Sequence, residues 1–435
     1  MFANLFFLLL VLVLTNFAPQ TGGIAWISSP FFAFLWGIGL YFVFLGLVFI
    51  QTLFLARRTS TSFLIILTNI ELLVFLGIYH SGLGSYRFLE ILAPSFAQSL
   101  TAITSILFYL IGISWTHYWT APLEIFHTTS PISHASRQAQ FLLPFCLPFL
   151  SLIFISDFIT LLPFSIHLED SSPISWLINI FLIGLSLILM PVLVMTCWNC
   201  EPLEDPAITP RLEAICVQAK FKHAGIRTWG VMKHSFTAAI IGIIPHFRYV
   251  MFTKPVLREF SPQEIEAILI HEIGHSRYKH LLFYPFIFLG ILIISFILFP
   301  LITTLLSEYI YLNKELGHFT YYSILFIIYA CLLGLYLRIV FGFFSRLFER
   351  QADLHIFEYS TSPTYMISAL NHIAVVTGYT HNQPNWHHFS IRERIQFLQA
   401  AFVHPSLIFA HHRKVKKWLS LYFIALAGCC VYIYF

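Results

Sequence analysis

Long apolar runs separated by short polar segments make up most of the sequence. A helix needs about 20 apolar residues to cross the ~30 Å hydrocarbon core of a bilayer. About nine runs approach or exceed this length, so the pattern predicts a mostly α-helical, polytopic membrane protein with about eight or nine spans. The runs cover approximately residues 1–18, 30–55, 62–80, 89–114, 140–164, 174–198, 281–306, 321–345 and 416–435.

The first run, residues 1–18, has two interpretations. A secretory signal peptide carries basic residues before its apolar core. This run instead begins with MFANLFFLLL, which has no basic residue. We therefore expect a retained membrane span, with a cleaved signal peptide as the alternative.

Composition and charge narrow the class of protein further. Hydrophobic residues make up 58% of the 435 residues and charged residues only 10%, which is too apolar for a soluble domain. The formal net charge of +4 is ordinary for loops that face anionic lipid. No basic patch is interleaved with aromatic residues outside the apolar runs. We therefore expect the lipid bilayer as a partner and no nucleic acid.

Lysine and arginine are unevenly distributed between the loops. If the N-terminus is cytoplasmic, most of the 24 Lys and Arg residues lie on the cytoplasmic side, as the positive-inside rule requires. Both long polar segments, residues 199–280 and 346–415, then face the cytoplasm. We expect a multi-pass protein of a bacterial plasma (inner) membrane, with an internal eukaryotic membrane as the alternative.

The order of apolar and polar segments predicts the domain organisation. Residues 1–198 form an N-terminal membrane domain of about six spans, residues 281–345 a two-span membrane hairpin, and residues 416–435 a C-terminal span. The polar segments 199–280 and 346–415 lie on either side of the hairpin. We expect them to be the two halves of one domain.

The first polar segment contains two recognisable elements. The stretch HSFTAAIIGIIPHFRYVMFTKPVL mixes β-branched and aromatic residues, which predicts a hairpin around Pro245. After it, SPQEIEAILIHEIGHSRYKH predicts a helix. Ser261 suits the N-cap, Pro262 suits the first helical position, and Glu264 completes a capping box.

Three charged residues stand inside the predicted spans: Glu71, Asp157 and Arg338. Because a charge is costly in lipid, these side chains should face the bundle interior or a wet cavity. Two interpretations remain open. The three residues line a chamber for substrate or water, or Asp157 and Arg338 neutralise each other.

The stretch HEIGH carries the first candidate chemistry. His271 and His275 are four residues apart on the predicted helix, so both imidazoles project from one face and suit two ligands of a tetrahedral zinc. Glu272 lies about 100° around the helix, where it can polarise a water molecule without being a ligand. The alternative is chance, with a probability on the order of a few per cent in a chain this rich in histidine. His280, five residues after His275, should turn away from this face, and we expect it at the surface.

A second candidate cluster follows the membrane hairpin. In SRLFERQAD, Glu349 and Asp353 lie one helical turn apart. A catalytic zinc takes three protein ligands and keeps one open position, so Glu349 is the candidate third ligand. Asp353 would accept a hydrogen bond from a ligand histidine and orient it. Taken alone, the same residues also fit a solvated helix face.

Together, HEIGH and SRLFERQAD resemble the motifs of the membrane zinc metallopeptidases of the HtpX and CAAX prenyl-protease family, in which HELGH is followed by SRxxExxAD. The resemblance implies a gluzincin-like site in which His271, His275 and Glu349 hold one zinc ion per chain. It implies that Glu272 is the general base and that Asp353 supports the ligands. The two polar segments would then form a zincin-like α+β protease domain.

A further block extends the resemblance beyond the metal site. HHFSIRERIQFL resembles the family's His-Pro-x-x-x-x-Arg block. This implies that His388 lies near the zinc, where it binds substrate or stabilises the tetrahedral intermediate, and that Arg394 supports the site. Phe389 replaces the proline of the family pattern, a departure within this loop.

The last matching block lies upstream of HEIGH. TAAIIGIIPHFRYVMFT resembles the family's Asn-Ala-x-x-x-Gly strand, which lies along the substrate. Thr237, Ala238 and Gly242 occupy the matching positions. Thr237 stands where the family usually has Asn, so the contact between this strand and the substrate is expected to differ.

These observations lead to a functional expectation. We expect a zinc-dependent integral membrane endopeptidase that cleaves membrane proteins or membrane-attached peptides, with membrane-protein quality control as one possible role. Two other classes stay open. One is a sensor-transducer built on a similar protease domain, although no sizeable polar segment falls on the outer side. The other is a transporter or scaffold in which the HExxH sequence is incidental.

Overall fold

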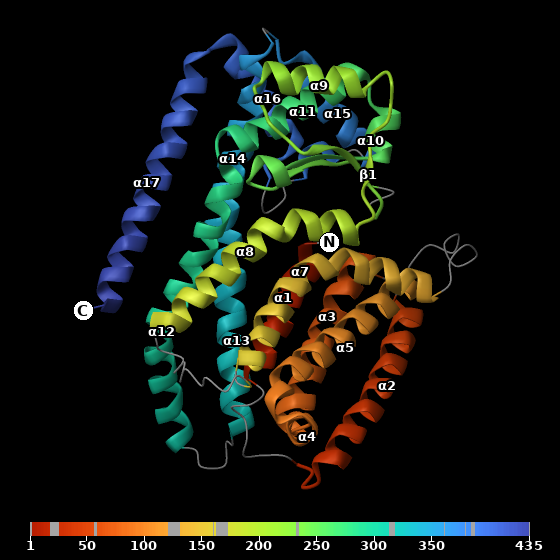
Figure 1. Cartoon of the computed structure of the whole chain (residues 1–435), viewed down its shortest axis with the longest axis vertical. Helices are drawn as coiled ribbons and strands as arrows, with labels where there is room; N and C mark the ends of the chain where they lie inside the picture. Colours follow the sequence, from red (N-terminus) through yellow and green to blue (C-terminus); the bar gives the residue numbers. More distant parts are fainter. Residues whose placement is uncertain are drawn as a thin grey trace. The chain divides into compact units, whose positions relative to one another are not determined.

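The structure is a computed structural model, and it divides the chain into two compact units (Figure 1). Unit 1 comprises Met1–Ser186 and Thr303–Ala330, and unit 2 comprises Leu187–Ile302 and Cys331–Phe435. The five-part organisation expected from the sequence stays a prediction. The structure describes residues 2–17, 26–55, 59–120, 131–159, 161, 173–231, 235–312, 318–360, 362–378, 380–383 and 388–434.

Unit 1 is helical and is organised around one helix, α5 (Ala97–Thr120). Five other helices pack against α5. They are α1 (Phe2–Phe17), α2 (Pro30–Leu55), α3 (Thr61–Gly77), α4 (Tyr86–Leu92) and α7 (Pro131–Ile159). A π-helical turn (Ile78–Gly82) follows α3, a 3₁₀ turn (Pro94–Phe96) precedes α5, and α8 (Pro173–Cys197) follows α7.

Polar side chains inside unit 1 satisfy one another. The Tyr109 hydroxyl donates to Asn69 Oδ1 at 2.8 Å, and Asn69 Nδ2 donates to Asn4 Oδ1 at 3.4 Å. The carboxylate of Asp157 accepts from both the backbone N–H and the hydroxyl of Ser99, at 2.9 and 2.6 Å. Burial of Asp157 is therefore offset by hydrogen bonds near the start of α5.

The expected fold class is confirmed: the described residues form a mostly α-helical chain with eight helices long and apolar enough to cross a membrane. The first apolar run is not among these eight. Within it, the described α1 has 16 residues, shorter than the ~20 that a span needs. The side chain of Arg338, on a π-helical turn (Leu337–Phe341), is exposed and so is not packed in a bundle interior; its position in a wet cavity stays a prediction.

Unit 2 contains a four-stranded sheet in the order β1-β2-β4-β3. The strands are β1 (Glu201–Pro202), β2 (Gly225–Trp229), β3 (Ala238–Ile241) and β4 (Tyr249–Thr253). Strands β2 and β4 are parallel, and β3 pairs antiparallel with β4. No other described strand pairs with the outer edge of β3. A 3₁₀ turn (Pro245–Phe247) joins β3 to β4, which confirms the predicted hairpin.

The HEIGH helix, α11 (Pro262–Arg277), packs on this sheet through its apolar face. Ile265, Leu269 and Ile273 join the buried residues Val250 and Phe252 of β4 in one core. The predicted capping box is confirmed at its start, where the side chains of the N-cap and the third helical residue bond each other's backbone N–H groups. Two short helices flank this core, α9 (Thr209–Gln218) and α10 (Lys254–Glu259).

The remaining helices of the chain begin immediately after α11. Helix α14 carries the SRLFERQAD motif and packs against α11, α16 and α17. A buried cluster that includes Ile287, Phe348 and Leu419 joins α12, α14 and α17. The elements are α12 (His280–Leu312), α13 (His318–Tyr336), α14 (Gly342–Asp353), a 3₁₀ helix (Leu354–Glu358), α15 (Thr364–Val376), a 3₁₀ turn (Thr380–Asn382), α16 (Ile391–Val403) and α17 (Ser406–Tyr434).

Candidate metal centre

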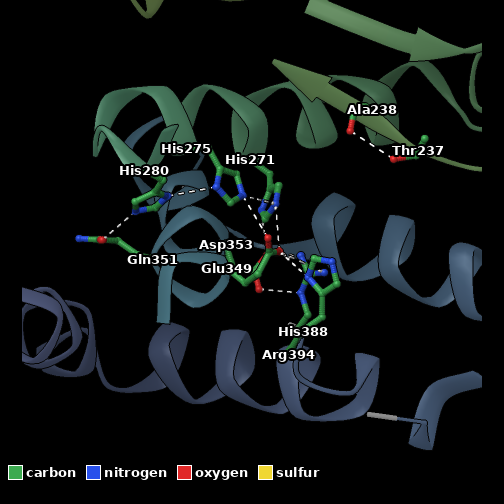
Figure 2. A network of polar contacts seen from close by, with 10 residues as sticks. All are labelled: Thr237, Ala238, His271, His275, His280, Glu349, Gln351, Asp353, His388 and Arg394. Atoms are coloured by element: carbon green, nitrogen blue, oxygen red, sulfur yellow. Dashed lines mark hydrogen bonds and ion pairs between the residues drawn. The ribbon is translucent and has the colours of Figure 1, made fainter. Parts of the chain in front are cut away.

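Two helices bring three potential metal ligands together (Figure 2). His271 and His275 project from α11 and Glu349 from α14, with one ligand atom of each within 4.8 Å of the others. The two histidine Nε2 atoms are 3.2 Å apart. The Glu349 carboxylate oxygens lie 3.6 Å from Nε2 of His271 and 3.4 Å from Nε2 of His275.

The chemistry of this donor set fits a bound zinc ion. Two imidazole nitrogens and one carboxylate converge from three side chains that are each at most 12% exposed. Burial lowers the pKa of His275 to about 4, so its imidazole is neutral and has a lone pair for a metal. Two histidines and a glutamate with one open position match a catalytic zinc site.

Asp353 and Arg394 form the layer behind His271. Asp353 Oδ1 lies 2.9 Å from His271 Nδ1, so Nδ1 carries the proton and Nε2 is left for a metal. Arg394, from α16, holds the same carboxylate with two bonds, from Nε at 2.9 Å and from Nη2 at 2.6 Å. Burial lowers the pKa of His271, but the bond to Asp353 and its negative charge outweigh burial and raise it.

Glu272 lies beside the three converging groups. Burial raises the pKa of its carboxyl group to about 7, opposed in part by the nearby charge of His271. The backbone N–H of Ile240, in strand β3, also stabilises the charged form. Glu272 therefore faces the edge strand of the sheet, and its pKa suits a group that takes up and releases a proton near neutral pH.

His388 approaches the site from the residues before α16. Its Nδ1 lies 3.2 Å from Glu349 Oε2, and its side chain is 37% exposed, the most open of the histidines at this site. Arg394 Nη1 lies 3.8 Å from the same oxygen. The structure thus brings the predicted residues of HEIGH, SRLFERQAD and the His388–Arg394 block into one place.

Thr237, Ala238 and Gly242 lie elsewhere, along strand β3. Figure 2 places Thr237 and Ala238 apart from the metal ligands. The Thr237 backbone N–H donates to the hydroxyl of Thr253 at 3.2 Å. Gly242 has a positive φ of 102°, and an added Cβ would collide with the carbonyl group of Phe247. The local backbone geometry alone therefore explains a glycine at position 242, without a role in substrate binding.

The expectation that His280 lies at the surface is wrong. Its side chain is fully buried, and its ring stacks on Phe348 at 4.2 Å between centroids. Its Nδ1 lies 3.1 Å from Nδ1 of His275. The helical-wheel argument fails because α11 ends at Arg277 and Lys279 is left-handed (φ 60°), so His280 belongs to the next helix.

Gln351 is a site residue that the sequence analysis missed. It is 7% exposed, and its Oε1 lies 3.0 Å from Nε2 of His280. The sequence offered one signal: Gln351 is a polar residue between Glu349 and Asp353 to which the predicted metal site assigned no role. Residue type alone does not distinguish a buried glutamine from a solvated one.

Gly274 explains how the two helices approach closely enough to share a metal. A Cβ at this position would lie 3.1 Å from Ala352 Cα and 3.0 Å from His355 Cβ. The glycine of HEIGH thus lets the backbone of α11 contact the segment that carries Glu349 and Asp353. Helix separation at this point sets the distance between the ligands.

We expect Gly274→Ala to push these helices apart by a few tenths of an ångström. The strain should destabilise the protein by about 1–3 kcal/mol and weaken metal binding. Thermal unfolding and a zinc titration measure the two effects. Gly428→Ala is the matched control, since its added Cβ meets no atom within 4 Å. Equal zinc affinity in the Gly274→Ala variant and the wild type would contradict this explanation.

Comparison with known protein families shows what the segment that carries these residues is similar to. Residues 202–406 match the sequence model of peptidase family M48. This segment contains HEIGH, SRLFERQAD and the His388–Arg394 block. Residues 202–406 are thus similar to the peptidases of family M48. The chain is therefore a metallopeptidase, a hydrolase of peptide bonds, and its apolar helices make it a multi-pass membrane protein.

Other comparisons add less. No curated protein matches the chain. The crystal structure of S. mikatae Ste24p matches with 16% sequence identity and a TM-score of 0.38, over 86% of this chain and 99% of that one. A structural similarity this weak carries no argument about the site. The roles of the site residues are therefore argued from their motifs and geometry.

Proposed function

We propose that the protein is a zinc-dependent membrane endopeptidase with one zinc ion per chain, held by His271, His275 and Glu349. The observation that carries the proposal is the convergence of these three side chains, two of them buried and one mostly buried, within 4.8 Å in a segment that matches the M48 model. When bound, zinc would acidify water and polarise the carbonyl of the scissile peptide bond. The protein's own residues supply the remaining chemistry.

Glu272 acts as the general base. It lies next to the ligand His271 but points toward strand β3, and its pKa of about 7 lets it take a proton from the attacking water. The same carboxyl group then donates that proton to the leaving amine. Its partly buried position limits exchange of the proton with bulk water between these two steps.

His388 and Arg394 place a hydrogen-bonding ring and a positive charge beside the Glu349 carboxylate. His388 is partly exposed and lies 3.2 Å from Glu349 Oε2, so it can reach a substrate beside the metal ligands. We propose that it donates a hydrogen bond to the oxygen of the tetrahedral intermediate. Arg394 is buried behind Asp353 and holds that carboxylate, which in turn orients His271.

Strand β3 is proposed to bind the substrate backbone. It is an edge strand, so its outer N–H and C=O groups can pair with an extended peptide. The Glu272 carboxylate interacts with the backbone N–H of Ile240 in this strand. A peptide paired along Thr237, Ala238 and the residues after them would therefore run past the proposed general base.

Membrane-embedded helices beside this segment favour substrates that are themselves in or on the membrane. Helix α12 starts three residues after α11 ends, and α14 continues directly from the apolar segment that includes α13. We propose membrane proteins or membrane-attached peptides as substrates, with quality control as one role. The distribution of Lys and Arg favours a site that faces the cytoplasm, and we propose a bacterial plasma membrane as its location.

The experiment is performed on the purified full chain in lipid nanodiscs. We expect about one zinc per chain and cleavage of a fluorogenic peptide carrying a lipid anchor. Removal of zinc with 1,10-phenanthroline should abolish cleavage, and added zinc should restore it. Zinc-independent cleavage, or a metal-free protein after reconstitution with zinc, would rule out the proposal.

A further inference from the structure

A chain of polar groups, which includes the buried residues His280 and Gln351, leads away from the ligand His275 (Figure 2). His275 Nδ1 lies 3.1 Å from His280 Nδ1, and His280 Nε2 lies 3.0 Å from Gln351 Oε1. On the other side of the amide, Gln351 Nε2 lies 2.8 Å from Nδ1 of His412, on α17. The proposed catalytic steps use none of His280, Gln351 and His412.

The amide of Gln351 fixes the direction of every hydrogen bond in this chain. Its oxygen only accepts, so His280 Nε2 must donate and His280 Nδ1 must accept. His275 Nδ1 therefore carries the proton that it donates to His280. The lone pair of His275 is then on Nε2, the atom that faces His271 and Glu349.

A reversed amide would have the opposite consequence. Gln351 would donate to His280 Nε2, and His280 Nδ1 would donate to His275 Nδ1. His275 would then carry its proton on Nε2 and could not bind a metal there. The orientation of one glutamine, whose amide nitrogen lies 2.8 Å from Nδ1 of His412, therefore separates a ligand histidine from a non-ligand one.

We propose that His280, Gln351 and His412 are positioning residues that set the tautomer and ring orientation of His275 for metal binding. The ligand pair is asymmetric: Asp353, a carboxylate, orients His271, whereas a neutral histidine orients His275. His411 fixes the far end, because its Nε2 lies 3.0 Å from the carbonyl oxygen of Leu347 and so ties α17 to α14. This inference rests on the proposed zinc site.

The test measures zinc affinity by competition with a chelator in full-length variants, alongside the melting temperature of each metal-free protein. Gln351→Met keeps the size of the side chain and removes the acceptor. Gln351→Glu keeps an acceptor for His280. We expect zinc affinity to fall about 10- to 100-fold in the Met variant and to stay within about threefold of wild type in the Glu variant.

Variants of His280 and His412 test whether the effect on zinc affinity decreases with distance from His275. His280→Phe retains a ring that stacks on Phe348 and should weaken zinc binding at least as much as Gln351→Met. His412→Ala, one step further away, should have the smallest effect.

The outcomes separate this inference from the proposed function. If the wild type binds no zinc, the proposed function fails first. If the wild type binds zinc and Gln351→Met binds it equally well, the positioning role is overturned while the zinc site stands. Equal weakening by the Met and Glu variants, with matching losses of melting temperature, assigns Gln351 a packing role only and also overturns the inference.

A second feature of unit 2 carries an independent inference. A hollow of about 370 Å³ lies at the start of α12 and is surrounded by four cations, Lys220, Arg248, Arg277 and Lys279. Across the described residues, none of the four has a carboxylate within 4 Å. Its apolar wall includes Leu282, which is exposed in the first turn of this candidate span.

The hollow is separate from the metal centre. Ile273, which lines it, lies about 200° around α11 from the ligand His271. Arg248 is held in place at the rim, since its Nε donates to the carbonyl of Gly242 at 3.3 Å and its guanidinium lies 5.2 Å from the Phe221 ring centroid. Cations above an apolar helix turn match a phosphate group attached to an acyl chain.

We propose that this hollow binds the phosphate of an anionic phospholipid whose acyl chain runs along α12. Near a membrane surface each cation contributes about fivefold in affinity, so Lys220→Gln, Arg277→Gln and Lys279→Gln together should weaken phosphatidylglycerol binding roughly 100-fold. Native mass spectrometry of the detergent-solubilised chain counts the bound lipid. Lys414→Gln, Lys416→Gln and Lys417→Gln, at the start of α17, remove equal charge as a control.

Two outcomes would overturn the lipid site. Equal lipid loss in both triple variants would mean that bulk charge and not this hollow attracts the lipid. Displacement of phosphatidylglycerol by millimolar inorganic phosphate would mean that the hollow takes a soluble phosphate. Selective loss in the first variant, with no displacement by phosphate, is the expected result.

Discussion

Replacing Glu272 with glutamine should lower peptide cleavage by about 10³-fold while the protein still folds and binds zinc. The amide keeps the size of the side chain but cannot take the proton of the attacking water, and general-base catalysis contributes about 10²–10⁴-fold. Glu272 lies beside His271 without joining the converging ligand atoms, so its loss should not release the metal. Cleavage of a membrane-anchored peptide and zinc content measure the two properties.

The control for this variant lies on the same helix. Glu266→Gln removes a carboxylate that pairs with Arg211 at the surface, at 2.6 Å, and surface ion pairs contribute little to stability. Its cleavage rate should stay near that of the wild type. A Glu272→Gln enzyme that retains more than about a tenth of the wild-type rate would refute general-base catalysis by this residue.

The second large effect concerns Glu349, the ligand from α14. Glu349→Ala should weaken zinc binding by roughly 100-fold or more. A zinc-binding free energy of about 10–16 kcal/mol, shared among three ligands, assigns about 3–5 kcal/mol to each. Removal of the carboxylate also takes away the negative group that faces His388, whereas Arg394 keeps its two bonds to Asp353. Cleavage should therefore be lost at zinc concentrations that saturate the wild type.

Glu358→Ala supplies the comparison for Glu349→Ala. Glu358 lies in the 3₁₀ helix that follows α14, and its exposed carboxylate accepts from the Tyr278 hydroxyl at 2.9 Å. It contacts none of the three proposed ligands, so zinc affinity should be unchanged. If Glu349→Ala binds zinc as tightly as Glu358→Ala, the third ligand lies elsewhere.

Local sequence signals predicted the elements that carry the site. The Ser261–Glu264 capping box and the apolar spacing of α11 define a helix within one contiguous stretch, and Pro245 marks the hairpin. The convergence of α11 with α14 could not be predicted from such local signals. These helices are separated by the long segment 278–341, and only the resemblance of their motifs to one family related them before the structure.

The residues that sequence reasoning misplaced depend on backbone geometry or tertiary packing. A single left-handed residue, Lys279, ends the helical register and turns His280 inward. Burial of Gln351 depends on α17, which is distant in sequence and contributes His412.

X-ray absorption at the zinc edge of the purified wild-type protein tests the central claim most directly, because it reports the atoms bound to the metal. The predicted result is one zinc per chain with only nitrogen and oxygen neighbours at about 2.0–2.2 Å, including two imidazoles, and a loss of this spectrum in Glu349→Ala. Sulfur neighbours at about 2.3 Å, from cysteines such as Cys197 and Cys200, would contradict the proposed site. So would a wild-type protein that binds no zinc.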